Sequence, residues 1–415
     1  MRLFTLELKR ILKKRISQIL MGLAILCSLV LAWLPSSYCY STGMDAAGQE
    51  VMLTGLESVQ YEKARQAAAS GLVTPEKVKA AVETYQACLQ KYDVTESWDL
   101  PPGVYEQEIM PVAPLLHGVK EAFANPKTGM APSIMEIDPE KLDDWYSLCN
   151  ERIVSLMTME QPESPAAQEQ AVKMYESVKK PFRVHPGMNT ASLDYQNMLG
   201  FLILLFCVVM AAPAFASGYQ NGADDILRCT RHGRGKIAAV RIMAALCVSG
   251  IGFLLCAGVY IIATNAFFGW ECVQTSVQMM YSIVALPGWR VGQLQLFFAG
   301  AATLSVLASV SLTLFVSARC QTSLSALAVS LLLCLLPTVA AMTMPGEIST
   351  WLGVLLPAGG TGIQASFLYA ATDFQFLSLG PLAVWTPWAM VAAWLVEIPL
   401  FALLTVRVYC SHQPG

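Results

Sequence analysis

The sequence predicts an all-α integral membrane protein with six transmembrane helices and a large helical extracellular domain between the first and the second. Composition is one reason: 55% of the 415 residues are hydrophobic and 14% are charged, whereas soluble domains carry about 25% charged residues. A second reason is six apolar stretches, each long enough to cross about 30 Å of hydrocarbon as a helix of about 20 residues. The third is a separation of positive and negative charge along the chain.

The predicted membrane-spanning segments are residues 16–34, 198–217, 237–268, 294–316, 323–344 and 382–406. Segment 237–268 is longer than a membrane requires, so we expect its helix to tilt or to begin in the interface. The first segment could instead be a cleaved signal peptide. It lacks an Ala-x-Ala-like cleavage site, and its apolar run of about 19 residues exceeds a usual signal core. We therefore expect a retained span.

Charge predicts the orientation. Residues 1–15 hold six basic residues and one acid, and the loop 217–241 holds five basic residues. With the N-terminus inside, thirteen basic residues lie on the inner side and only Arg290 lies in a short outer loop. Because short cytoplasmic loops are enriched in Lys and Arg, we expect both termini, including the tail 407–415, to be cytoplasmic. Residues 35–195, with 23 acidic and 13 basic residues, then form an extracellular domain.

This domain is predicted to be helical, with helix starts where an N-cap residue precedes a proline at Thr74, Asp138 and Ser164. Apolar residues recur at helical spacing within it, and we expect them to form its core. His117 and His185 are isolated and are expected to be structural. Cys39, Cys88 and Cys149 match no zinc spacing, and their disulfide state stays open. Paired carboxylates and nucleophile–base patterns are absent from the sequence, so no catalytic or metal-binding residue is predicted.

Two cytoplasmic segments carry more information than a plain connector. Residues 1–15 predict an amphipathic helix on the anionic inner membrane surface, with Phe4, Leu8, Ile11 and Leu12 on one face. The loop 217–241 predicts a short helix at about 220–231, followed by a turn at 233–235. For both segments, the alternative is that the charges only set the membrane topology.

The order of the segments and the amino-acid sequence of the loop 217–241 resemble those of a known protein family. The loop reads Phe215-x-x-x-Tyr219-x-x-Gly222-Ala-Asp224-x-Ile-Leu227, then Gly233-Arg234-x-Lys236. This is similar to the permease subunits of type-2 ABC transporters, in which the loop couples to the nucleotide-binding subunit. The resemblance implies coupling roles for Tyr219, Gly222, Leu227, Gly233, Arg234 and Lys236. The family often has a Glu before the Tyr, where this chain has Gly218.

Arg228 and Arg231 in the same loop extend the candidate coupling site, because Arg makes bidentate contacts with partner carboxylates. The sequence lacks the Gly-x-x-x-x-Gly-Lys-Ser/Thr pattern that cradles nucleotide phosphates. The chain is therefore predicted not to be an ATPase itself, but a non-enzyme that binds no cofactor. The resemblance implies that a separate cytoplasmic ABC ATPase subunit uses the ATP. The resemblance also implies a second permease copy, as a homodimer or heterodimer, in a bacterial cell membrane. Membrane lipids are expected partners, and nucleic acid is not.

Two features stand out in the region 196–406. Glu397 lies in the last span, where a carboxylate costs roughly 3 kcal/mol unless it is paired, protonated or facing water. It could line a pathway or bond to a neighbouring helix. Residues 345–381 are expected to form an external re-entrant or interfacial segment.

The predicted function is that of an exporter subunit, moving an apolar or amphipathic substrate with the energy of a separate ATPase. The alternative is a membrane sensor or scaffold whose external domain binds a ligand or a cell-wall component.

Overall fold

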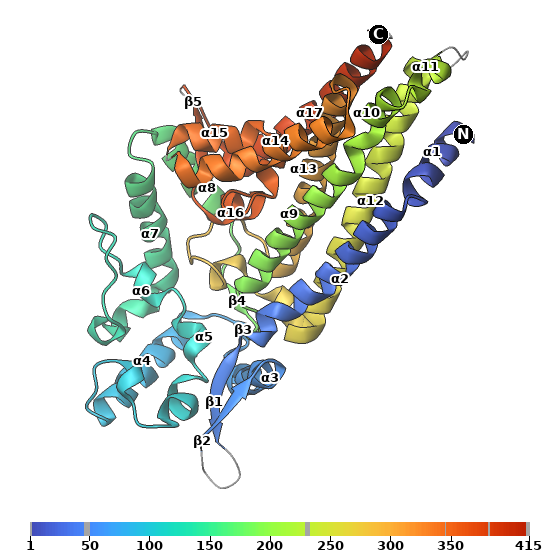
Figure 1. Ribbon diagram of the computed structural model, residues 1–415. Helices are drawn as coiled ribbons and strands as arrows, with labels where there is room; N and C mark the ends of the chain where they lie inside the picture. Colours follow the sequence, from blue (N-terminus) through green and yellow to red (C-terminus); the bar gives the residue numbers. More distant parts are fainter. Residues whose placement is uncertain (1, 45–49, 229–232, 345, 381, 412–415) are drawn as a thin grey trace.

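The computed structural model describes residues 2–44, 50–228, 233–344, 346–380 and 382–411. The chain is mostly helical, with little sheet and six segments that are long and apolar enough to cross a membrane. They form one slanted bundle (Figure 1). The segments are α2 (Arg15–Ser37), α9 (Ala191–Ala211) continued by α10 (Pro213–Gln220), α12 (Gly235–Phe268), α13 (Val291–Arg319), α14 (Ser323–Thr343) and α17 (Thr386–Ser411).

Both chain ends lie at one end of this bundle, beside the short helix α11 (Ala223–Arg228) (Figure 1). We call this the proximal end and the opposite one the distal end. Helix α1 (Arg2–Leu12) packs along α12 at the proximal end. The predicted N-terminal helix over 1–15 was too long, because α1 ends at Leu12 and Lys14 is extended before α2 begins at Arg15.

The last span also starts later than predicted. Residues Leu382–Trp385 form strand β6, and the helix begins at Thr386 with Pro387 in its first turn. Proline suits that position because the first N–H groups of a helix have no partner within it. The apolar run continues without a break from strand to helix, so hydropathy alone did not separate them.

Helix α13 is the centre of the bundle. It packs against α9, α12, α14 and α17, and 72% of its membrane-length window is buried inside the protein. Small residues such as Ala299, Ala302 and Ala308 allow the neighbouring helices to approach closely. Four of its hydroxyls, those of Thr303, Ser305, Thr313 and Ser317, donate to backbone carbonyl oxygens, as at Ser305, which donates to that of Pro357 at 2.6 Å.

The distal ends of three spans are joined by buried amides. Gln196 of α9 donates to the backbone carbonyl of Gln295 in α13 at 3.0 Å. The Gln295 side chain exchanges two hydrogen bonds with Asn265 of α12, at 3.2 and 3.3 Å. Hydrogen-bonded amides of this kind stabilise helix contacts where water is excluded.

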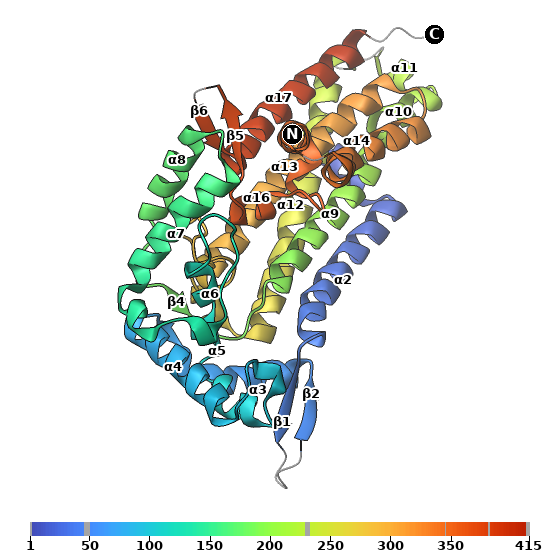
Figure 2. The ribbon, with the colours of Figure 1, turned by 90° about the vertical axis from the view of Figure 1, so that its left-hand side faces the viewer.

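The chain between α2 and α9 forms a body at the distal end, which Figures 1 and 2 show extending along one side of the bundle. We call residues 38–190 the distal body. Its helices and strands are β1 (Tyr40–Met44), β2 (Glu50–Thr54), α3 (Leu56–Arg65), β3 (Gly71–Leu72), α4 (Pro75–Lys91), α5 (Ala113–Leu116), α6 (Val119–Ala122), α7 (Trp145–Glu160), α8 (Pro165–Glu176) and β4 (Arg183–Val184). Short helical turns lie at Gln66–Ala69, Ser97–Asp99, Tyr105–Ile109, Ile134–Glu136 and Pro139–Asp144.

The three predicted helix starts are confirmed. Thr74 caps α4 by accepting from the Lys77 N–H, and Ser164 caps α8 by accepting from the Ala167 N–H. Asp138 caps the turn Pro139–Asp144 in the same way. The sheet in this body was not predicted: β1 pairs with β2 and β3 with β4, both antiparallel.

The core of the distal body is apolar, as predicted. Its fully buried side chains include Trp145, Val78, Val82, Leu89 and Leu142. Cys88 and Cys149 lie in this core as free thiols, and Cys39 is also free.

The distal body is hydrogen-bonded to the loop between α12 and α13. This loop contains the turns η6 (Trp270–Gln274) and η7 (Val277–Met279). Tyr175 donates to the Ile283 carbonyl oxygen at 2.9 Å, and the Ile283 N–H donates to Glu121 at 3.1 Å. His117 Nε2 lies 2.9 Å from the Tyr281 carbonyl oxygen. Gly118 has φ +76°, and a Cβ there would lie 2.0 Å from Ile283, so only glycine permits this approach.

Residues between α14 and α17 complete the distal end. They form α15 (Glu347–Leu355), η8 (Pro357–Gly360), α16 (Phe367–Thr372) and the hairpin of β5 (Phe376–Leu379) with β6. A short helix was expected in 345–381, and α15 and α16 are both short. Ile348 and Leu355 of α15 are exposed.

Candidate functional site

The predicted coupling residues lie at the proximal end. Tyr219 is on α10, Gly222 is in the turn before α11 with φ +67°, and Leu227 is a half-buried residue of α11. Gly233 is buried, whereas Arg234 and Lys236 are exposed at the start of α12. Arg228 is the last residue of α11. Arg231 lies outside the described residues.

The short helix α11 confirms the prediction of a helix in this loop, although over fewer residues. It places Asp224 inward, with 1% of its surface exposed, and Ile226 outward, with 75% exposed. One side of α11 is therefore anchored in the protein and the other faces away from it.

Asp224 is anchored by a charged cluster made of Glu7, Arg10, Asp224, Arg241 and Tyr409. Asp224, Arg241 and Tyr409 are buried, Glu7 is partly buried, and Arg10 lies at the exposed edge. The Arg241 guanidinium donates to Asp224 Oδ1 at 3.4 Å, and its Nε lies 3.6 Å from Glu7 Oε1. The Tyr409 hydroxyl donates to the same Asp224 oxygen at 2.7 Å. Glu7 also pairs with Arg10 at 2.7 Å. We call these five residues the proximal cluster.

The proximal cluster joins four separate helices. Glu7 and Arg10 come from α1, Asp224 from α11, Arg241 from α12 and Tyr409 from α17. Its two carboxylates balance its two guanidinium groups. Arg241 is 3% exposed, and buried charges of this kind are tolerated when they are paired. Burial lowers the pKa of Arg10, while the Glu7 carboxylate opposes this shift.

Aromatic rings close the cluster on the side of α10. The Arg241 guanidinium lies 5.6 Å from the Phe215 ring centre and 6.0 Å from that of Tyr409. Tyr409 also contacts Phe215, with ring centres 5.2 Å apart, and stacks with the predicted residue Tyr219 at 6.4 Å. Cation–π contacts add to the ion pairs where water is excluded.

A polar clamp sets the direction in which α10 leaves the bundle. Pro213 interrupts the helix after α9, which leaves backbone groups without helical partners. The Ser317 hydroxyl of α13 donates to the Ala212 carbonyl oxygen at 2.6 Å. It also accepts from the N–H groups of Phe215 and Ala216 at 3.0 and 3.1 Å. Ser317 therefore fixes the bend that brings Phe215 and Tyr219 to the cluster.

Gly218, where the resembling family often has Glu, lies against Asp224. A Cβ at position 218 would be 3.3 Å from Asp224 Oδ1. A larger side chain at 218 would therefore press on the carboxylate that Arg241 and Tyr409 hold. In this chain the acid near Tyr219 comes from α11 instead of from the residue before the tyrosine.

Glu397 does not belong to the proximal cluster. It is half-buried in α17, two residues before Pro399. Within the described part of the chain, its Oε2 atom is buried and has no hydrogen-bond partner. Of the two predicted roles, bonding to a neighbouring helix is therefore not seen for that oxygen.

Sequence reasoning missed Glu7, Arg10 and Tyr409 as site residues, and it missed the pairing of Arg241 with Asp224. Arg241 was counted only as an orienting charge, although it lies within the apolar span 237–268. A lone arginine inside a span was the available signal, because such a charge needs a partner. Across the described residues, no group of His, Cys, Asp and Glu could hold a metal ion.

Sequence comparison finds no protein family and no curated protein that matches this chain.

Proposed function

We propose that this chain is the membrane-spanning permease subunit of an ATP-driven ABC exporter, working with a separate cytoplasmic ATPase. The observation that carries the proposal is the proximal cluster. It connects the loop between the second and third spans to α1, α12 and α17 through buried charges. A force applied to α11 would reach three other helices without passing through flexible chain.

The orientation follows from charge. The proximal end carries the basic residues of α1 and of the loop 217–241, and short cytoplasmic loops are enriched in such residues. On this assignment the proximal end is cytoplasmic, and the distal body, with its excess of acids, is extracellular.

The mechanism that we propose is a shift between two arrangements of the bundle. ATPase subunits bind the outward side of α11 at Ile226 and the start of α12 at Arg234 and Lys236, and all three side chains are exposed. When the ATPases close, they bind one arrangement more tightly than the other, which moves the population toward it. Asp224 and Arg241 carry the displacement into α12 and α17. A second permease copy completes the transporter, and the substrate is apolar or amphipathic.

Co-purification from membranes tests the partner. We expect the charge-reversal variant Arg234→Glu with Lys236→Glu to remove most of the co-purifying ATPase, because both side chains are exposed at the start of α12. Ile226→Asp should act in the same way through the apolar contact. The matched control is Lys141→Glu, an exposed lysine of the distal body, which should leave the association unchanged.

An ATPase that stays bound to both loop variants, with normal membrane insertion, would count against coupling through this loop. A histidine kinase or another signalling protein in its place would favour the alternative, a sensor. The grip of the distal body on residues 281–283 would suit that role, because it links the body to the bundle.

A further inference from the structure

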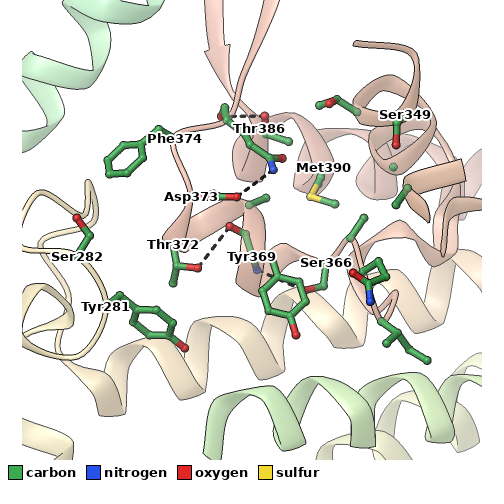
Figure 3. Close-up of a pocket in the computed structure, with 18 of the residues that line it drawn as sticks. Tyr281, Ser282, Ser349, Ser366, Tyr369, Thr372, Asp373, Phe374, Thr386 and Met390 are labelled. Atoms are coloured by element: carbon green, nitrogen blue, oxygen red, sulfur yellow. Dashed lines mark hydrogen bonds between the residues drawn. The ribbon is translucent and has the colours of Figure 1, made fainter. Parts of the chain in front are cut away.

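A cavity at the distal end has a volume of about 880 Å³. Its walls come from the distal ends of α14 and α17, from α15 and α16, and from the loop that the distal body grips. Figure 3 shows Tyr281 and Ser282 of that loop facing Tyr369, Thr372 and Asp373 of the segment before β5. Cavities of about 300–1,000 Å³ hold drug-sized molecules.

The charge of the cavity has one sign. Asp373 is the single lining residue that is charged at neutral pH, and neither Lys, Arg nor His lines the cavity within the described residues. A neighbouring cavity of about 230 Å³ shares Gly346, Thr350 and Gln375 with it and adds a second acid, Glu347. An anion would meet carboxylates here with no compensating cation, whereas a cation would be attracted.

The rest of the lining is suited to an apolar body with a polar end. Tyr281, Tyr369 and Phe374 provide aromatic faces, on which organic cations bind through cation–π contacts. Met280, Met344 and Met390 provide adaptable apolar surface. The Tyr281 hydroxyl is buried and has no hydrogen-bond partner among the described residues, so it is available to a ligand.

Among the described residues, Asp373 forms no ion pair with a Lys, Arg or His. Its carboxylate accepts a hydrogen bond from the Gln375 amide at 3.3 Å. Asp373 is exposed at the wall of the cavity, so its carboxylate can be reached by a ligand. Partial desolvation by the surrounding residues raises its pKa, and a bound cation would oppose that shift.

We propose that this distal cavity binds an organic cation with an apolar body, held by Asp373 and by the rings of Tyr281, Tyr369 and Phe374. Two of these residues depend on the distal body. His117 holds the backbone of Tyr281, and Gln161 of the α7–α8 turn donates to the Phe374 carbonyl oxygen at 3.4 Å. The distal body thus shapes the cavity without filling it. That the cavity binds a cation does not depend on the proposed function. That this cation is the transported substrate does rest on it.

The test uses the purified full-length chain in an uncharged detergent, without any ATPase. Radiolabelled tetraphenylphosphonium is the probe, and tetraphenylborate, an anion of nearly the same size and shape, is its counterpart. We expect saturable binding of the cation by equilibrium dialysis and no competition by the anion. Asp373→Asn should weaken cation binding by roughly fivefold, the upper range for one partly exposed charge pair.

Two further variants and one control define the site. Asp373→Glu should keep the affinity because it keeps the charge, and Phe374→Leu should weaken binding through loss of the ring while the cavity stays apolar. Glu57→Gln removes an exposed acid of α3 that does not line the cavity. It should leave the affinity for the cation unchanged.

Equal binding of the anion and the cation, or unchanged affinity in both Asp373→Asn and Phe374→Leu, would overturn the cavity assignment. Neither outcome depends on the ATPase. Cation binding that persists while no ATPase co-purifies would leave this site standing and remove the transport proposal. If the ATPase co-purifies but the chain binds no cation, the transport proposal stands and the cation site is overturned.

Discussion

At the scale of single residues, Arg241 is the side chain on which the proximal end depends most. It pairs with both Glu7 and Asp224, and its guanidinium lies within 6.0 Å of the centres of two aromatic rings. The stability of such a group comes from its partners, because removing one member leaves the others charged and buried.

We therefore expect Arg241→Met to lower the free energy of unfolding by about 3–5 kcal/mol. The double variant Arg241→Met with Asp224→Asn should be less destabilised than the sum of the two single changes, because the orphaned carboxylate is gone. Thermal unfolding in detergent measures both. Arg319→Met is the control, since that arginine is exposed at the end of α13 and its loss should cost little. If the losses in unfolding free energy of Arg241→Met and Asp224→Asn simply add in the double variant, the two side chains do not stabilise each other as proposed.

At the scale of elements, the bend between α9 and α10 is held by one hydroxyl. Ser317 satisfies three backbone groups there. An unsatisfied buried backbone group costs about 1–3 kcal/mol.

Replacing Ser317 by Ala should therefore lower stability by at least about 1 kcal/mol and speed proteolysis of the loop after α10. Thr, which keeps the hydroxyl, should be milder. The chain supplies a matched control in Ser311, also fully buried on α13 but with no hydrogen-bond partner within the described residues. Ser311→Ala should be nearly neutral. Equal effects at 311 and 317 would show that the clamp contributes nothing specific.

The sequence predicted the positions of the membrane-spanning helices better than it predicted the contacts between them. Four spans, α2, α12, α13 and α14, begin and end within three residues of their predicted limits, because hydropathy over about 20 residues is a local property. The second span begins at Ala191, seven residues before its predicted start at 198. The break at Lys13–Lys14 carries no Gly or Pro, so it could not be located. The β6–α17 junction lies inside an apolar run, and hydropathy alone missed it, although Thr386-Pro387 is the same N-cap and proline pattern that marked the starts of α4 and α8. The proximal cluster was beyond local reasoning, since Asp224 and Tyr409 are 185 residues apart.

For the whole molecule, the decisive feature is the attachment of the distal body to the bundle. His117 contributes through Nε2, which lies 2.9 Å from the Tyr281 carbonyl oxygen. Burial lowers its pKa, while this hydrogen bond and the Glu121 carboxylate oppose the shift. The folded state therefore binds a proton at His117 less readily than the unfolded state does.

It follows that the contribution of His117 to stability is present above its ordinary pKa of about 6.5 and is lost as the pH falls below that value. We expect a lower unfolding temperature at pH 5.5 than at pH 7.5. His117→Gln keeps a donor for the Tyr281 carbonyl and does not titrate, so it should reduce this difference. His185, whose pKa is also lowered by burial, accounts for a remainder. An unchanged pH dependence in His117→Gln would contradict the argument.

The position of Tyr409 has a consequence for biogenesis. Asp224 and Arg241 emerge from the ribosome long before the sixth span, yet the tyrosine hydroxyl that completes their pairing is near the end of that span. Until then the loop has an unfinished anchor. A chain that stalls before its final helix would expose a charged, half-assembled surface, which membrane quality control could recognise and remove before any partner is engaged.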